Sequence, residues 1–395
     1  MKKKIFIPVY GGGHCKLIIS LYDSLIRKFD VTILALTLAE EYLSNHEIPY
    51  KTLKDYLEYI DLGDNIVQLG DQFIKENNID YERIGLYNSS IYYGCNIRDY
   101  ILKYGKDDIV DSYGKQNRLI FLPINTMEAI LKIENPDAVL TTNSPRFERA
   151  SILAAKNLGI TNYSIEDLLG NSRVFSLKDT NTDYYGDYIF VLNNFVRENL
   201  INQGVKAKKI VVSGLPTFDN LKNHYTDIFN FKQRYGIDLN KKIITWASHA
   251  SEDEIYIFEE LLKVFTLNNE YLLIIKPHPN ENYSYMEKML AKIHTNSIRL
   301  IENCDIRDLI NISELLLTQY STCGLEALFM QTPVIVLNPF DKKYDTDYSS
   351  LNIASKCQDL SKILINIEEK KQYHLNFEVI NNSINNMINF IDNTI

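Results

Sequence analysis

The sequence predicts an α/β protein made of two doubly wound, Rossmann-like domains, each built on a parallel sheet. Short apolar runs alternate with segments of helical periodicity in two separate series, which is typical of right-handed βαβ crossovers. The chain has 395 residues, and a chain of this length usually forms more than one hydrophobic core. We therefore expect an N-terminal domain over 1–205 that faces a C-terminal domain, 206–375, across a cleft. The last segment, 376–395, is expected to be a helix that packs back on the first domain.

The first series begins with an apolar strand over 4–10, a helix over 16–29 and a strand over 31–36. The stretch 54–118 is polar and rich in tyrosine, and it predicts helical and loop insertions rather than strands. The alternation then resumes, with strands expected at 137–143, 160–166, 188–194 and 209–214 and helices at 147–159 and 195–204.

The second series begins near residue 241, after a junction around 214–225. Its expected strands are 241–248, 271–279, 298–303, 314–320 and 333–338, and its helices are 252–265, 283–293, 306–312 and 323–331. Ligands of open parallel sheets bind beyond the carboxyl ends of the strands, where the strand order reverses. Polar residues that follow a buried strand are therefore the first candidates for a site.

Composition and charge exclude several classes of function. The formal net charge is −9, whereas nucleic-acid binding requires clustered lysine and arginine. The five cysteines show no metal-binding spacing, and their odd number favours a reducing cytoplasm. No apolar run has the length of a membrane span, and the glycine-rich N-terminus does not resemble a signal peptide. We expect a cytoplasmic protein, with peripheral contact at the inner face of the membrane as an option, and no cofactor, metal or nucleic acid.

The segment after the strand 314–320 carries candidates for a donor site. Ser321 and Thr322 stand before or at the start of a helix, whose free N–H groups attract an anion such as a phosphate. Gly324 and Glu326 lie in the first turn, and the Glu326 carboxylate could accept two hydrogen bonds from a ribose diol. The structural alternatives are an ordinary helix cap for the hydroxyls and dipole compensation for the carboxylate.

Two more strand ends of the second series carry polar side chains. Lys276 and His278 follow the strand 271–279 in the motif KPHPN, where the prolines stiffen the turn. Both could stabilise negative charge on a leaving phosphate. Ser248 and His249 follow the first strand of the series and could line the same site. A capping box formed by Ser251 with Glu254 is the structural alternative there.

The first strand-to-helix turn reads GGGHC and places Gly12, Gly13 and His14 at a sheet edge. Glycines allow a ligand to approach the backbone, although the spacing fits neither a Walker A nor a dinucleotide loop. An imidazole of ordinary pKa, near 6.5, accepts a proton at neutral pH, so we expect His14 to be a general base. Glu148 and Glu166 are the alternative bases. Arg146 and Arg149, beside Glu148, would either contact the second substrate or belong to a solvated helix start.

The assembled pattern resembles the two-domain nucleotide-sugar glycosyltransferases of the GT-B fold. The run VYGGGH resembles the glycine-rich His loop of lipid-linked N-acetylglucosaminyl transferases and of pseudaminate-pathway UDP-sugar hydrolases, which implies a place for His14 at the reaction centre. The junction VSGLPTFDNL resembles the Val-x-Gly-Asn-Pro segment of these families, with Leu215 in place of the Asn.

The second half of the chain extends this resemblance. CGLEALFMQTPVIVL is similar to the family's helix and Pro-led strand, whose Glu binds the ribose, and this implies the same role for Glu326. KPHPN and QYSTCG resemble the His-Pro and Ser motifs of bacterial capsule, Kdo and sialic acid transferases and of glycerophosphate polymerases. Those motifs hold the donor phosphate, which implies His278, Ser321 and Thr322. These families use different nucleotides, so UDP and CMP or CDP stay open.

The resemblance implies a metal-independent glycosyltransferase that uses a nucleotide-sugar donor and a surface-glycan or lipid-linked acceptor. The second domain would bind the donor and the first the acceptor. A hydrolysing UDP-N-acetylglucosamine 2-epimerase is the first alternative, although that family's Gly-Thr-Arg-Pro-Glu loop is replaced here by GGGHC. A non-catalytic nucleotide-sugar binding protein is the second. The sugar, the acceptor, the stereochemical outcome and the oligomeric state stay open.

Overall fold

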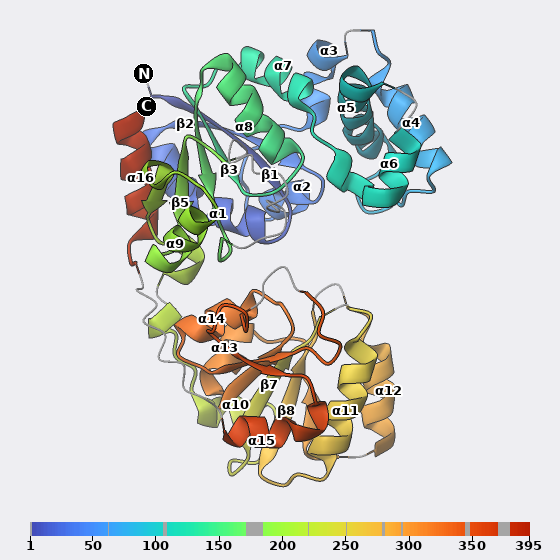
Figure 1. Ribbon diagram of the computed structural model, residues 1–395, viewed down its shortest axis with the longest axis vertical. Coiled ribbons are helices and arrows are strands. Elements are labelled where there is room, and N and C mark those ends of the chain that lie inside the picture. Colours follow the sequence, from blue (N-terminus) through green and yellow to red (C-terminus); the bar gives the residue numbers. More distant parts are fainter. Residues whose placement is uncertain are drawn as a thin grey trace. The chain divides into compact units, whose positions relative to one another are not determined.

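The computed structural model describes residues 2–61, 63–105, 109–170, 185–219, 221–249, 251–278, 281–293, 295–343, 348–369 and 380–395. The chain divides into two compact units, one made of Met1–Asp219 with Val379–Ile395 and one of Asn220–Glu378. Each unit contains a six-stranded sheet in which all paired strands are parallel. The predicted α/β class, with two doubly wound parallel sheets, is confirmed (Figure 1).

The sheet of the first unit has the strand order β2-β1-β3-β4-β5-β6. Its strands are β1 (Lys4–Tyr10), β2 (Asp30–Leu36), β3 (Ala138–Thr142), β4 (Thr161–Ile165), β5 (Tyr188–Val191) and β6 (Ile210–Val212). The central strands are buried along almost their whole length, because helices cover both faces of a parallel sheet. Since β6 belongs to this sheet, the N-terminal segment of the first unit continues beyond the expected boundary at residue 205, as far as Asp219.

The helical elements of the first unit fall into those around the sheet and those of the insertion. Around the sheet lie α1 (Gly13–Lys28), α2 (Ala39–Ser44), α7 (Ile124–Glu134), α8 (Phe147–Leu158), α9 (Asn194–Asn202), η5 (Ala207–Lys209), η6 (Pro216–Phe218) and α16 (Ser383–Thr394). Helix α16 packs on α1, where Lys28 pairs with Asp392 at 2.7 Å. The Phe390 ring of α16 also contacts Tyr188 of β5, with ring centroids 5.0 Å apart.

The tyrosine-rich insertion forms a group of helices at one side of the first unit (Figure 1). It contains η1 (Leu53–Tyr56), α3 (Leu57–Ile60), α4 (Ile66–Glu76), α5 (Leu86–Tyr104), α6 (Ile109–Gln116) and η2 (Asn117–Ile120). Helices α4 and α5 approach closely because Gly70 and Gly94 lack side chains, which would overlap the Ser90 and Ile66 backbones. Rings of α5 such as Tyr92 belong to the same core cluster as Phe6 of β1, so the insertion is part of the unit's core.

The second unit has the strand order β12-β11-β10-β7-β8-β9. Its strands are β7 (Lys242–Ala247), β8 (Tyr271–Lys276), β9 (Ile298–Leu300), β10 (Leu315–Thr318), β11 (Val334–Leu337) and β12 (Ser355–Cys357). Its helices are η7 (Leu221–Asn223), α10 (Ile228–Arg234), α11 (Glu254–Thr266), α12 (Ser284–Ile293), α13 (Ile306–Ile312), α14 (Cys323–Phe329), η8 (Leu360–Lys362) and α15 (Ile363–Glu368). The sequence did not predict β12, which is short and has no apolar run. No helix within the described residues is both long and apolar enough to cross a membrane.

Candidate active site

Each sheet has a point at which its strand order reverses, and polar side chains gather there. In the first sheet, β1 lies between β2 and β3, and in the second, β7 lies between β10 and β8. The carboxyl ends of the two strands at such a point leave a crevice between their loops, which is the usual ligand site of these folds. The first crevice carries His14 and Thr142, and the second carries His249 and Ser321.

His14 is held by two oxygen atoms on its Nδ1 side. Nδ1 lies 2.8 Å from Oγ1 of Thr142 and 3.3 Å from Oδ2 of Asp167. The Thr142 hydroxyl donates its own proton to Glu148, so it accepts a hydrogen bond from Nδ1–H. This arrangement places the proton of the neutral imidazole on Nδ1 and leaves the lone pair of Nε2 for a substrate. The side chain is 30% exposed, so Nε2 is within reach of a ligand.

The pKa of His14 departs from the expected ordinary value. Burial alone would lower it, but the charge and hydrogen bond of the Asp167 carboxylate, with Glu148 adding to them, raise the pKa to about 9. The expectation of an unperturbed imidazole is therefore wrong. At neutral pH the unliganded protein carries His14 as an imidazolium, and the ring must lose this proton before it can act as a base.

The two alternative bases are buried and already hydrogen-bonded. Glu148 accepts hydrogen bonds from the hydroxyl of Thr142 and from the backbone N–H groups of Tyr10, at 3.3 Å, and Ser144, at 3.4 Å. Glu166 accepts from Asn143 at 3.0 Å and from the Tyr185 hydroxyl at 3.2 Å, among its donors. Burial, with the nearby charge of Asp167, raises the pKa of Glu166 to about 7. The geometry gives Glu148 the task of orienting His14 through Thr142.

A hollow with a cavity volume of about 340 Å³ opens in front of His14. We call it the His14 hollow, and its lining residues are Tyr10, Gly11, His14, Thr37, Leu38, Asp80, Tyr81, Arg83, Ile84, Arg118, Ser144 and Arg146. The Arg146 guanidinium lies 4.6 Å from the centre of the Tyr10 ring. Arg83 pairs with Glu41 at 3.3 Å, and Arg118 and Arg146 still outnumber the single aspartate of the lining, so the hollow favours an anion. Arg149 is not among the lining residues.

The three glycines of the GGGHC turn differ in how much space surrounds them. A side chain at Gly11 would lie 2.7 Å from Cβ of Leu38, so this position is closed by packing. Gly12 has φ = +78°, a conformation that favours glycine, and a side chain at Gly12 or Gly13 would meet open space. The backbone of these two residues is therefore open to a ligand.

The second unit brings two histidines together at its crevice. The ring centroids of His249 and His278 lie 5.2 Å apart, and the His249 ring stands edge-on to Tyr320 at 4.1 Å. Burial and the neighbouring His278 lower the pKa of His249, so its imidazole is neutral at neutral pH. Its Nδ1 is buried and has no hydrogen-bond partner within the described residues. A buried polar nitrogen without a partner requires an explanation, and a ligand atom would provide it.

A buried pair of carboxyl groups, Glu281 and Glu254, adjoins the turn that carries His278, and no motif of the sequence indicated it. Glu281 accepts hydrogen bonds from the Ser248 hydroxyl at 2.7 Å and from the backbone N–H of His278 at 2.8 Å. Burial and a hydrogen bond with Glu281 raise the pKa of Glu254 well above the usual range. The protonated Glu254 thus donates to Glu281, and Glu281 fixes the turn that carries His278. The expected capping box is wrong, because the N-cap residue of α11 is Asp253 and the cap has no side-chain hydrogen bond. The Ser251 hydroxyl instead donates to Gln319 at 3.2 Å.

This pair predicts a pH-dependent stability. Folding holds on Glu254 a proton that the unfolded chain releases near pH 4.5, the ordinary value for this side chain. The thermal unfolding midpoint is therefore expected to fall as the pH rises from about 4.5 into the alkaline range. Glu254→Gln keeps the hydrogen bond without a titrating proton, so its midpoint should depend less on pH than that of the wild type. Identical pH profiles for the two proteins would contradict the shared proton.

The residues at the start of α14 have structural roles in the unliganded chain. Oγ of Ser321 accepts a hydrogen bond from the backbone N–H of Cys323 at 3.3 Å, and the carbonyl of Ser321 accepts from the Tyr348 hydroxyl at 2.7 Å. Thr322 precedes the helix without a side-chain cap. A side chain at Gly324 would lie 2.6 Å from the Tyr348 ring, so this glycine is required by packing. Lys276 donates to the carbonyl of Glu302 at 2.8 Å.

Glu326 has a partner that the sequence did not indicate. Nη2 and Nε of Arg307 lie 3.1 Å and 3.4 Å from Oε1 of Glu326. Arg307 belongs to α13, and the exposed fractions of the two side chains are 36% and 18%. An ion pair at this exposure adds little to stability. It leaves Glu326 ionised and oriented, as a carboxylate that binds a diol needs to be.

We expect Glu326→Ala to weaken nucleotide binding by about 1–3 kcal/mol, the scale of hydrogen bonds to a charged group. The unfolding midpoint should change little, because the pair with Arg307 is partly exposed. Calorimetric titration with the nucleotide gives the affinity, and Glu314→Ala in the same unit is the control. An unchanged affinity in Glu326→Ala would remove Glu326 from the nucleotide site.

Within the described residues, no group of three or more His, Cys, Asp or Glu side chains is arranged to hold a metal ion.

Comparisons with known proteins agree with this architecture. Residues 151–374, more than half of the chain, match the family model of CDP-Glycerol:Poly(glycerophosphate) glycerophosphotransferase. The teichoic acid poly(glycerol phosphate) polymerase of Bacillus spizizenii is 28% identical over 165 residues, which are 39% of this chain and 41% of that relative. The chain therefore spans less than half the length of this relative.

Other similar proteins are epimerases. The UDP-N-acetylglucosamine 2-epimerase of Methanococcus maripaludis is 26% identical over 63% of this chain and 70% of its own. The crystal structure of UDP-GlcNAc 2-epimerase from Neisseria meningitidis bound to UDP-GlcNAc has a TM-score of 0.60 at 17% identity, and the match covers 99% of both chains. This likeness supports the GT-B-like fold of two Rossmann-like units.

Proposed function

Because the chain belongs to the CDP-glycerol:poly(glycerophosphate) glycerophosphotransferase family, we propose that it transfers a group from a nucleotide-linked donor to an acceptor hydroxyl. The transferred group is a sugar or a glycerol phosphate, the leaving nucleotide contains cytidine or uridine, and the acceptor is a surface glycan or a lipid-linked glycan. The similar epimerase from Neisseria meningitidis is bound to UDP-GlcNAc in its crystal structure, which supports a nucleotide-sugar as one form of the donor. The reaction would take place in the cytoplasm, with the acceptor presented at the inner face of the membrane.

The observation that carries this proposal is the imidazole pair at the crevice of the second unit. Glycosyl transfer breaks the bond from the sugar carbon to the phosphate oxygen, and glycerophosphate transfer breaks a phosphate–oxygen bond. In both, negative charge grows on a leaving phosphate. His249 has a buried nitrogen without a partner within the described residues. The centroids of the His249 and His278 rings lie 5.2 Å apart. Together with Lys276 and the Ser321 and Thr322 hydroxyls, they would receive that phosphate, while Glu326 binds the ribose.

The acceptor would bind in the first unit. Nε2 of His14 would remove the proton from the attacking hydroxyl once the ring is neutral, while Asp167 and Thr142 hold the opposite side of the ring. Gly12 and Gly13 leave space for the acceptor beside this nitrogen. The arginines of the His14 hollow would attract an acceptor that carries negative charge.

A panel of nucleotides tests the donor site. A ligand that binds the folded form raises its unfolding midpoint, so CDP, CMP or UDP is expected to raise the midpoint more than GDP or dTDP. His249→Ala should reduce this shift. The control is His224→Ala, which should keep the full shift, since the proposal gives His224 no contact with the nucleotide. His224 pairs with Asp308 at 3.0 Å. If no nucleotide raises the midpoint of the wild type, the proposal fails.

We also propose that the transfer requires no divalent cation and no cofactor. In a metal-dependent transferase, a cation neutralises the charge of the leaving phosphate. Here the side chains of Lys276, His249 and His278 would supply this stabilisation. The rate is therefore expected to be unchanged after treatment with excess EDTA. A loss of activity that Mg²⁺ or Mn²⁺ restores would contradict this part of the proposal.

A hydrolysing epimerase is the second candidate function. Its support is the match to epimerases over almost the whole chain and the 26% identity with the Methanococcus maripaludis enzyme. Such an enzyme consumes UDP-N-acetylglucosamine without an acceptor. A protein that only binds nucleotide-sugars would show the nucleotide shift without turnover of any donor.

A further inference from the structure

A second cavity of the first unit adjoins the His14 hollow, and no motif of the sequence points to it. We call it the α5 pocket. Its lining residues are Ala35, Leu36, Thr37, Glu40, Thr52, Leu53, Lys54, Asp80, Ile84, Asn88, Ser89, Ile91, Tyr92, Tyr93 and Arg118. They come from the end of β2, from α2, and from the tyrosine-rich insertion. The pocket and the His14 hollow share Thr37, Asp80, Ile84 and Arg118, so the two cavities adjoin.

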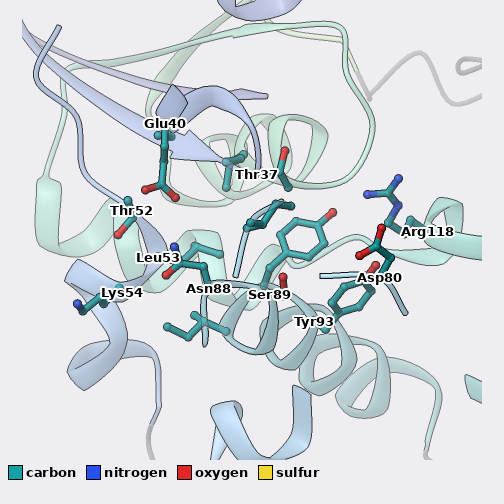
Figure 2. A pocket seen from close by; sticks show the side chains of 15 residues that line it. Thr37, Glu40, Thr52, Leu53, Lys54, Asp80, Asn88, Ser89, Tyr93 and Arg118 are labelled. Atoms are coloured by element: carbon teal, nitrogen blue, oxygen red, sulfur yellow. The ribbon is translucent and has the colours of Figure 1, made fainter. Parts of the chain in front are cut away.

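The walls of the α5 pocket present polar groups that the chain itself leaves unused. Within the described residues, the carboxylate of Glu40 makes no hydrogen bond or ion pair, and neither does the amide of Asn88 or the hydroxyl of Thr37. Figure 2 shows Glu40 with Thr52 and Lys54 on one side of the pocket and Asp80 with Arg118 on the other. The aromatic rings of Tyr92 and Tyr93 line the pocket together with these hydrogen-bonding groups, and we call the two rings its floor.

That floor is rigid. Tyr92 and Tyr93 of α5 are only 5% and 7% exposed, and their rings meet edge to face at 5.4 Å. The hydroxyl of Tyr92 lies 3.2 Å from that of Tyr10, so its ring is fixed in orientation. A fixed aromatic surface beside free hydrogen-bonding groups suits a ligand with an apolar C–H face and hydroxyls at its edge.

Thr37 is strained at the place where the two cavities meet. Its φ is +54°, in the left-handed region that is unfavourable for a β-branched residue. Such strain is found mostly where a side chain must be placed for a ligand. Here the strained backbone brings a free hydroxyl to the border between the α5 pocket and the His14 hollow.

The charges and the size of the α5 pocket select the ligand. Glu40 and Asp80 balance Lys54 and Arg118, so the pocket has no net attraction for an anion, unlike the His14 hollow. Its cavity volume is about 60 Å³, the space of about two water molecules at ~30 Å³ each. The pocket therefore takes one edge of a small polyhydroxy unit, whose remaining atoms would lie in the adjoining His14 hollow, and it excludes an oligosaccharide or a lipid chain.

We propose that the α5 pocket binds a single neutral sugar or polyol residue of the acceptor, next to the place where the acceptor hydroxyl reacts. Glu40 accepts hydrogen bonds from two neighbouring hydroxyls, Asn88 donates to a third oxygen, and the C–H face lies on Tyr92 and Tyr93. The reference to an acceptor rests on the proposed function. The binding of a neutral polyhydroxy unit rests on the pocket alone.

The test is ligand-observed NMR on the full chain. Saturation transfer from the protein is measured to methyl β-D-glucopyranoside, methyl N-acetyl-β-D-glucosaminide and glycerol, one at a time. At least one is expected to receive saturation, and the signal should fall at least fivefold in Glu40→Ala and in Asn88→Ala. Glu76→Ala, an exposed position of α4 outside the pocket, should keep the full signal. Unfolding midpoints show whether each variant is folded. If one of the two pocket variants is unfolded, the other one still tests the proposal.

Three results would overturn the proposal: no transfer to any of the three compounds, equal transfer in wild type and pocket variants, or displacement of the bound compound by inorganic phosphate. The nucleotide panel is run on the same samples. If nucleotides bind and the neutral compounds do not, the α5 pocket proposal falls and the proposed transferase function stands. If the neutral compounds bind and the nucleotides do not, the proposed transferase function falls and the α5 pocket stands as a site for a neutral polyhydroxy unit.

Discussion

Replacing His14 by alanine is expected to lower the transfer rate by about 10²–10⁴-fold, the usual contribution of a general base. The imidazole is the group of the His14 hollow whose free nitrogen can accept the proton of an acceptor hydroxyl, while its Nδ1 is held by Thr142 and Asp167. His14→Asn keeps hydrogen bonding without basicity, so it should be nearly as slow. Nucleotide affinity should stay at the wild-type value in both, and His46→Ala, an exposed histidine of the same unit, is the control.

The raised pKa of His14 gives this prediction a second readout. Because the protonated ring cannot accept a proton, kcat/KM is expected to rise with pH, with an inflection near pH 9 and a plateau above it. Asp167→Asn removes the carboxylate that raises the pKa of His14, so the inflection should move to lower pH. An active His14→Asn enzyme, or an inflection that Asp167→Asn leaves in place, would show that His14 only positions the substrate.

Replacing His278 by alanine is expected to lower kcat by about 10²–10³-fold, the effect of removing one donor to a developing charge. The turn that carries this ring is fixed by Glu281, which accepts a hydrogen bond from the His278 backbone at 2.8 Å. This hydrogen bond does not depend on the side chain, so the variant should fold and keep most of its nucleotide affinity. Charge on the phosphate is largest as the bond breaks, and the rate should therefore suffer more than binding.

The comparison of the two losses decides the role of His278. Single-turnover rates with a saturating donor are compared with calorimetric affinities for the product nucleotide, and His224→Ala is the control in the same unit. Equal losses in rate and affinity would mean that His278 only binds the ground state.

The fold was predictable because most of its strands are short, buried runs rich in apolar residues. The run 4–10 coincides with β1, and most other strands lie within one to three residues of their expected bounds. β12 was missed because three residues with one buried side chain carry no periodic signal. The strand orders, which create the crevices beside β1 and β7, come from pairings between distant segments, and they cannot be read from local periodicity.

The candidate site was predictable only in part, for a related reason. His14, His249 and His278 follow strands and could be singled out, but their partners could not. Asp167 follows β4, which lies two strands away from β1 in the sheet. Its contact with His14 depends on this strand order and could not be predicted from the sequence. Glu281 and Glu254 form a buried pair. In the sequence, Glu281 stands in a polar stretch typical of a solvated loop, and Glu254 stands where a helix cap is expected. The α5 pocket exists only because the insertion folds back onto β2, so no segment of the sequence shows it.

The most direct test of the proposed transfer is ³¹P NMR of the nucleotide products, with and without a glycan acceptor. CDP-glycerol and UDP-N-acetylglucosamine are offered in turn as donors, together with a lipid-linked surface-glycan precursor. The proposal predicts product nucleotide only when the acceptor is present: CMP if glycerol phosphate is transferred, or UDP if a sugar is transferred. Release of UDP from UDP-N-acetylglucosamine at the same rate without any acceptor would contradict the transferase proposal and favour the hydrolysing epimerase.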